Sequence, residues 1–82
     1  MGCFAFVAVG AMDQTVLLTH LGKAESYVVR SRRRLDRQRR IVADLERGGR
    51  ESGRSRYLLR LFEQILGRYL AHRDRLRDHI GL

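Results

Sequence analysis

The chain has 82 residues, which is enough for one small domain and excludes a multidomain architecture. Seventeen basic and 9 acidic side chains give a net charge of +8, so the surface attracts phosphates and anionic lipid whatever its function. The single cysteine, Cys3, excludes an intramolecular disulfide and fits a reducing compartment, so we expect a cytoplasmic protein.

Residues 1–11 form an apolar extension without a charged side chain. This run is too short to span a bilayer, and no basic region precedes it as in a secretory signal. Phe6 stands where an N-myristoylation motif prefers Ser or Thr. We expect residues 1–11 to be poorly ordered, with Met12 as the true or an alternative start. A short segment that touches a membrane or a partner is the alternative interpretation.

A long helix is predicted over about residues 13–47. Apolar residues recur there at alternating steps of four and three, which is the heptad pattern of a coiled coil. The predicted seam consists of Leu17, Leu21, Ala24, Val28, Ser31, Leu35, Gln38, Val42 and Leu45. The helix should end near Arg47 because Gly48 and Gly49 follow, and glycine is the usual residue just past a helix end.

A second helix is predicted over about residues 53–79, after a turn over 48–52. Ser52 is the better candidate for its N-cap, and Glu51 the weaker one. Its predicted seam consists of Leu59, Phe62, Leu66, Tyr69, Leu76 and Ile80, with Leu58 and Ile65 alongside and Arg73 as a polar interruption. Because the turn is short, residues 12–82 should form an all-α, antiparallel two-helix hairpin that resembles a coiled coil.

A turn centred near residues 51 and 52 predicts which seam residues face each other. Val42 should then face Phe62, and Val28 should face Leu76. In this alignment residues 12–21 extend beyond the second helix and expose an apolar row, which normally marks an association surface. The expected interface residues are Val16, Leu17 and Leu21. We therefore expect a homo-oligomer, most simply an antiparallel four-helix dimer.

The segment 30–40, "RSRRRLDRQRR", holds seven arginines in eleven positions. At 100° per residue most of them lie opposite the predicted seam, which is where any helix places its charges. The candidate anion or nucleic-acid contacts are Lys23, Arg30, Arg33, Arg34, Arg37 and Arg40. No helix-turn-helix, zinc-finger or RNA-binding motif accompanies them, so a solvated helix face is the preferred interpretation. Nucleic acid, an acidic protein or a membrane surface are the alternatives.

No pattern in the sequence indicates catalysis, a cofactor or a metal. His72 and His79 are seven residues apart, or about 10.5 Å along a helix, which is too far for two ligands of one metal. No metalloprotease motif, Cys-His cluster or phosphate-binding glycine loop is present. We therefore expect no enzyme activity, no cofactor and no metal site.

From His20 to Leu76 the chain resembles a group of small proteobacterial proteins of unknown function that are built as one helical hairpin. Four segments carry the resemblance: "HLGKAESYV", "LDRQRRIVADLERGGRE", "LLRLFEQIL" and "HRDRL". The resemblance implies the hairpin fold and leaves the activity open. We expect a small coiled-coil interaction protein that self-associates and binds a protein partner. The alternatives are a basic accessory factor that binds DNA or RNA without sequence preference, and a peripheral membrane protein.

Overall fold

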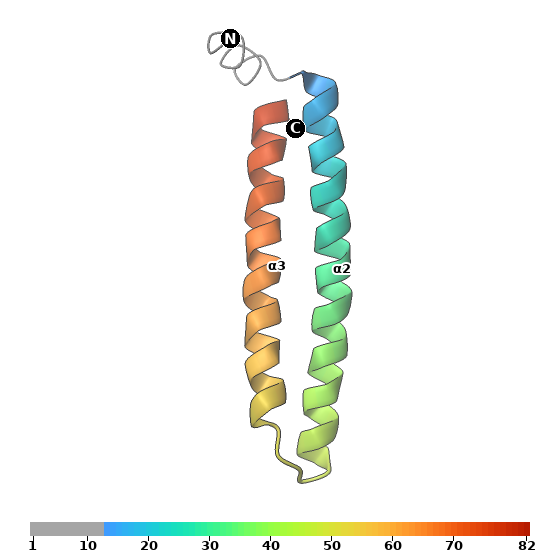
Figure 1. Ribbon diagram of the computed structural model, residues 1–82, viewed down its shortest axis with the longest axis vertical. Coiled ribbons are helices and arrows are strands. Elements are labelled where there is room, and N and C mark those ends of the chain that lie inside the picture. The colour runs from blue at the N-terminus through green and yellow to red at the C-terminus, as the bar shows by residue number, and fades with distance from the viewer. Residues whose placement is uncertain (1–12) are drawn as a thin grey trace, which may run out of the picture.

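The computed structural model describes residues 13–82, which form two antiparallel helices joined by a short turn (Figure 1). Helix α2 spans Gln14–Arg47 and helix α3 spans Gly53–Ile80. Figure 1 shows the helices side by side along nearly their whole length, with the turn at one end and the C-terminus near the start of α2. The predicted all-α helical hairpin is therefore confirmed.

The ends of α2 are formed by the residue types that favour them. The Asp13 side chain accepts a hydrogen bond from the backbone N–H of Thr15 at 3.0 Å, which satisfies one of the free donors of the first turn. At the other end Gly49 has a φ of +66°, a left-handed conformation that glycine adopts without strain. The backbone N–H groups of Gly49 and Arg50 reach back to the carbonyls of Glu46 and Leu45, which is the Schellman arrangement.

Helix α3 begins at the predicted residue, with the predicted N-cap residue in front of it. Ser52 occupies the N-cap position, but its side chain makes no capping hydrogen bond. Glu51 takes that role, because its Oε1 accepts a hydrogen bond from the backbone N–H of Gly53 at 2.8 Å. The longer Glu side chain reaches the free donor from one residue earlier in the chain. The prediction of Ser52 as the N-cap residue is therefore confirmed, but Glu51 supplies the side-chain hydrogen bond.

The two helices contribute unequally to the hydrophobic core. The buried residues of α2 are Leu17, Leu21, Ala24, Val28, Leu35, Gln38 and Val42. Helix α3 has no buried residue, and its seam side chains are all half-buried. Phe62 and Tyr69 of α3 contact Arg34 and Tyr27 of α2 and keep part of their surfaces exposed. One side of α3 is therefore left without a partner.

Within residues 13–82 the one buried polar side chain is that of Gln38, which is 7% exposed. Its Nε2 donates a hydrogen bond to the backbone carbonyl of Ser55 at 2.9 Å. A buried amide without this bond would destabilise the hairpin by about 1–3 kcal/mol. Gln38, which interrupts the apolar seam of α2, thus forms a hydrogen bond between the two helices.

The pairing of the two seams differs from the predicted one by a full heptad. Tyr27 stacks on Tyr69, and the guanidinium of Arg34 lies over the ring of Phe62. Phe62 therefore faces the turn of α2 that contains Leu35 and not the turn that contains Val42. The predicted Val42–Phe62 and Val28–Leu76 pairs were wrong.

The physical reason is that two heptad seams can pair equally well at alignments seven residues apart, and only the turn distinguishes them. The Schellman closure at Gly49 reverses the chain at once, so α3 starts alongside the last turns of α2. The ion pair between Arg56 and Glu46 lies at this end of the hairpin. A wider turn would have shifted α3 along α2 by one heptad and placed Phe62 opposite Val42.

This alignment also removes the predicted overhang of α2. The Nε2 of Gln14 donates to the carbonyl of Ile80 at 3.4 Å, so the two helices end almost level. Leu17 and Leu21 are 8% and 6% exposed and belong to the core of the hairpin. They are not available as an interface between copies, which corrects the prediction. Val16 is exposed, and Met12 lies outside the described residues.

Candidate functional site

The heptad positions divide the surface of the hairpin into two sides. In the notation abcdefg, positions a and d form the seam, positions e and b lie to one side, and positions g and c lie to the other. In an antiparallel pair the e positions of the two helices are neighbours, and so are the g positions. The ion pair between Glu25 and Arg77 joins two e positions, whereas the stack of Tyr27 on Tyr69 lies on the g side.

The side formed by the e and b positions carries no net charge, and we call it the neutral side. Its five arginines are balanced by five carboxylates. These residues are Arg32, Arg39, Arg56, Arg60 and Arg77 with Glu25, Asp36, Glu46, Glu63 and Asp74. Ion pairs on this side include Arg77 with Glu25 at 3.3 Å, Arg39 with Asp36 at 3.5 Å, and Arg56 with Glu46. All three are exposed, so each contributes about 0–1 kcal/mol to stability.

The opposite side, formed by the g and c positions, holds most of the excess positive charge, and we call it the basic side. Its seven cations are Lys23, Arg30, Arg34, Arg37, Arg54, Arg68 and Arg75. Its one helical carboxylate, that of Asp44, pairs with Arg47. Among the described residues none of the seven cations forms an ion pair. All seven are exposed, so their charge is available to a ligand.

Aromatic rings lie among these cations where the two helices meet. The rings of Tyr27 and Tyr69 stack with centroids 5.1 Å apart and planes at 17°. The guanidinium of Arg30 lies 5.3 Å from the centre of the Tyr27 ring, and that of Arg34 lies 5.6 Å from the centre of the Phe62 ring. Such cation–π contacts at exposed sites contribute about 0.5–1 kcal/mol each. The contact of Arg34 with Phe62 crosses from α2 to α3, whereas that of Arg30 with Tyr27 stays within α2.

The basic side also carries exposed apolar side chains. Tyr27 and Ile41 on α2 and Leu58 and Ile65 on α3 are between 36% and 42% exposed. All four occupy g positions and so border the line along which the two helices meet on this side, which we call the groove. Apolar side chains gathered in one place with cations around them mark an interaction surface more often than scattered ones do.

The predicted cation cluster is divided by the structure. Lys23, Arg30, Arg34 and Arg37 lie on the basic side, whereas Arg33 and Arg40 occupy f positions at the back of α2. Helix α3 adds three cations that the predicted cluster did not include, which are Arg54, Arg68 and Arg75. The signal was present, because all three share position c of the predicted second helix. Combining the c and g positions of both helices would have found the whole surface.

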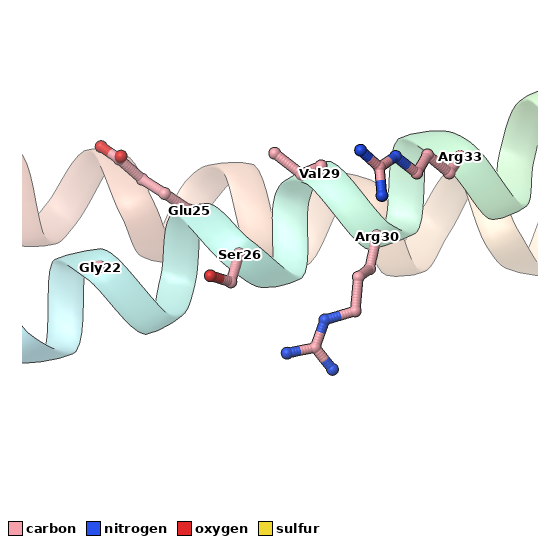
Figure 2. Close-up of a pocket in the computed structure, with 6 residues that line it drawn as sticks. All are labelled: Gly22, Glu25, Ser26, Val29, Arg30 and Arg33. Atoms are coloured by element: carbon pink, nitrogen blue, oxygen red, sulfur yellow. The ribbon is translucent and has the colours of Figure 1, made fainter.

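A shallow hollow lies on the outside of α2 and offers no enclosed site (Figure 2). Its lining residues are Gly22, Glu25, Ser26, Val29, Arg30 and Arg33. All six belong to one helix, and the hollow exists where Gly22 lacks a side chain. Figure 2 shows Glu25 and Arg30 extending in opposite directions, so their charged groups do not converge on a ligand.

Residues 13–82 contain no group of three or more His, Cys, Asp or Glu side chains that could hold a metal ion. Neither α2 nor α3 is long and apolar enough to cross a membrane. No protein-family model, curated protein or solved structure matches the chain. The resemblance to proteobacterial hairpin proteins therefore stays a prediction.

Proposed function

We propose that the protein is a small coiled-coil interaction protein that self-associates and binds another protein. The observation that supports this proposal is the incomplete burial of α3, which has no buried residue although eleven of its side chains are large and apolar or aromatic. The hairpin buries the seam of α2 but only half-buries that of α3. A further helix packed against α3 would bury more of this apolar surface and stabilise the hairpin.

The neutral side is the more suitable interface for self-association. Its balanced charges allow two copies to approach without the repulsion that two basic sides would meet. It also exposes Leu18 and Val29, which are 50% and 47% exposed, and it includes the half-buried Leu70. We propose these three residues in place of the predicted interface residues Leu17 and Leu21, which are buried.

Sedimentation equilibrium from about 1 to about 100 μM tests self-association. We expect a dimer in the tens of micromolar range, and the double variant Leu18→Gln/Val29→Gln should be monomeric there. A matched control, Ile41→Gln/Leu58→Gln, changes exposed apolar residues on the basic side and should leave the dimer intact. A well-folded wild-type monomer throughout the range would disprove self-association.

Non-specific binding of DNA or RNA is the second candidate, and the unpaired cations of the basic side favour it. Phosphate contacts weaken with salt, by a log–log slope of about −0.9 for each phosphate neutralised on duplex DNA. Fluorescence anisotropy with a short duplex at several salt concentrations measures this slope. A dissociation constant weaker than about 100 μM near physiological salt would reject this function. The apolar side chains among the cations favour a protein, because they cannot pair with phosphate.

A further inference from the structure

The groove on the basic side combines apolar side chains with an unbalanced positive rim. We propose that this groove binds an amphipathic helix of another protein, with an apolar stripe flanked by Asp and Glu. The inference deepens the proposed function, because it rests on protein binding and names the chemistry of the partner.

The length and lining of the groove fit a helix. Tyr27 and Ile41 are fourteen residues apart on α2, or about 21 Å along the helix axis. The contact of Arg34 with Phe62 places Leu58 and Ile65, one turn to either side of Phe62, opposite the stretch between them. Apolar side chains therefore line the groove over about four helical turns, with the guanidinium of Arg34 over Phe62 near the middle. A partner helix that presents residues i, i+4, i+7, i+11 and i+14 has an apolar stripe of the same length.

The charges around the groove specify the flanks of that helix. Arg30 and Arg37 lie along the α2 edge of the groove, and Arg54 and Arg68 lie along the α3 edge. A helix in the groove would place its own flanking positions against these two rows. Carboxylates there would meet unpaired guanidinium groups on both edges, and basic residues would meet repulsion. The partner helix should therefore be acidic on both flanks.

Two other occupants from this same chain fit less well. A second copy docked through this side would bring two surfaces together that each carry seven cations. Residues 1–12 contain no Asp or Glu, so they would leave the cations of this side unpaired.

A membrane fits the groove less well than a helix does. The apolar side chains border the groove between the helices, whereas the cations of the c positions lie farther out on both shoulders. A lipid surface would meet the charged shoulders first and leave the groove uncovered. A helix about 10 Å wide can enter between the shoulders and contact both sets of side chains.

A fluorescein-labelled synthetic peptide of three heptads tests the proposal with the full-length protein. The peptide has Leu at its a and d positions and Glu at its e and g positions, so that its own charges prevent self-association. A second peptide has Lys in place of every Glu. Measured by fluorescence anisotropy near physiological salt, the acidic peptide should bind at least about tenfold more tightly than the basic one.

Charge-matched variants locate the binding side. Arg37→Glu/Arg68→Glu reverses one cation on each edge of the groove and should weaken binding of the acidic peptide by about tenfold or more. Arg32→Glu/Arg60→Glu makes the same change in charge on the neutral side and should weaken it by less than about threefold. Ile65→Gln should also weaken binding, whereas Val29→Gln on the neutral side should not. Every substituted side chain is exposed, so all variants should fold, and circular dichroism melts verify that they do.

The proposal is overturned if the two peptides bind equally or if the two charge-reversed variants lose binding equally. It is also overturned if vesicles containing about one quarter phosphatidylserine bind the protein while the acidic peptide does not, since the groove would then serve a membrane. If Ile65→Gln turns a wild-type dimer into a monomer, the occupant is a second copy and the proposal fails. If the protein does not self-associate but still binds the acidic peptide, the proposal for the groove is supported. Only the self-association part of the proposed function is then rejected.

Discussion

The ring of Tyr27 in α2 stacks on the ring of Tyr69 in α3, with centroids 5.1 Å apart and planes at 17°. This contact, together with that of Arg34 with Phe62, defines how the two helices are aligned. In the alignment one heptad away, Tyr69 would face Leu35 instead. The stack therefore distinguishes two hairpins whose helices and seams are otherwise the same.

A double-mutant cycle on Tyr27→Leu and Tyr69→Leu should show a coupling energy of about 0.5–1.5 kcal/mol, because each change removes one ring of the stack. A second cycle on Leu35→Ala and Tyr69→Leu should give a coupling within about 0.5 kcal/mol of zero. Urea denaturation measures both. Strong coupling in the second cycle without coupling in the first would show that the helices pair in the other alignment.

The unequal burial of the helices predicts unequal costs for the same substitution. Leu21 is 6% exposed, whereas Leu76, in the facing part of α3, is half-buried. Leu21→Ala should cost about 2–4 kcal/mol, and Leu76→Ala about half as much, because less surface leaves the water at Leu76 on folding. Urea denaturation at about 1 μM protein measures both, at a concentration that favours the monomer. Equal costs would contradict the asymmetry of the core.

Two glycines inside the helices should be replaceable with a gain in stability. A Cβ added at Gly22 or Gly67 would meet nothing within 4 Å. Gly22→Ala and Gly67→Ala should each stabilise the hairpin by about 0.5–1 kcal/mol, because Ala loses less conformational freedom in a helix. Gly49→Ala should destabilise it by about 1–2 kcal/mol, because its φ of +66° is unfavourable for Ala. Thermal melts of the three variants would contradict this interpretation if all three changes had the same sign.

The side chains that cap the helices should differ in their effect on stability. Asp13→Ala and Glu51→Ala each remove an acceptor from a backbone N–H group and should cost about 0.5–2 kcal/mol. Ser52→Ala removes no capping hydrogen bond and should change stability by less than about 0.5 kcal/mol. Urea denaturation at neutral pH distinguishes these outcomes. A larger loss for Ser52→Ala than for Glu51→Ala would show that the Ser52 side chain makes the capping hydrogen bond.

By itself the sequence determined the two helices, the position of the turn and the residues of each seam. These features depend on local properties, namely a spacing of three and four, glycines after Arg47, and charges opposite the apolar residues. The outward position of Arg30 and Arg37 followed from the same periodicity. Each of these properties can be judged within a few turns of one helix.

The tertiary structure alone decided how the helices pair, because heptad seams fit each other again after every seven residues. The Schellman closure at Gly49 selected one alignment, and that choice buried Leu17 and Leu21 instead of exposing them. The same packing brought Arg68 of α3 to the side that holds Arg37 of α2. A continuous basic surface thus required contacts between residues far apart in the chain, which no periodicity within one helix contains.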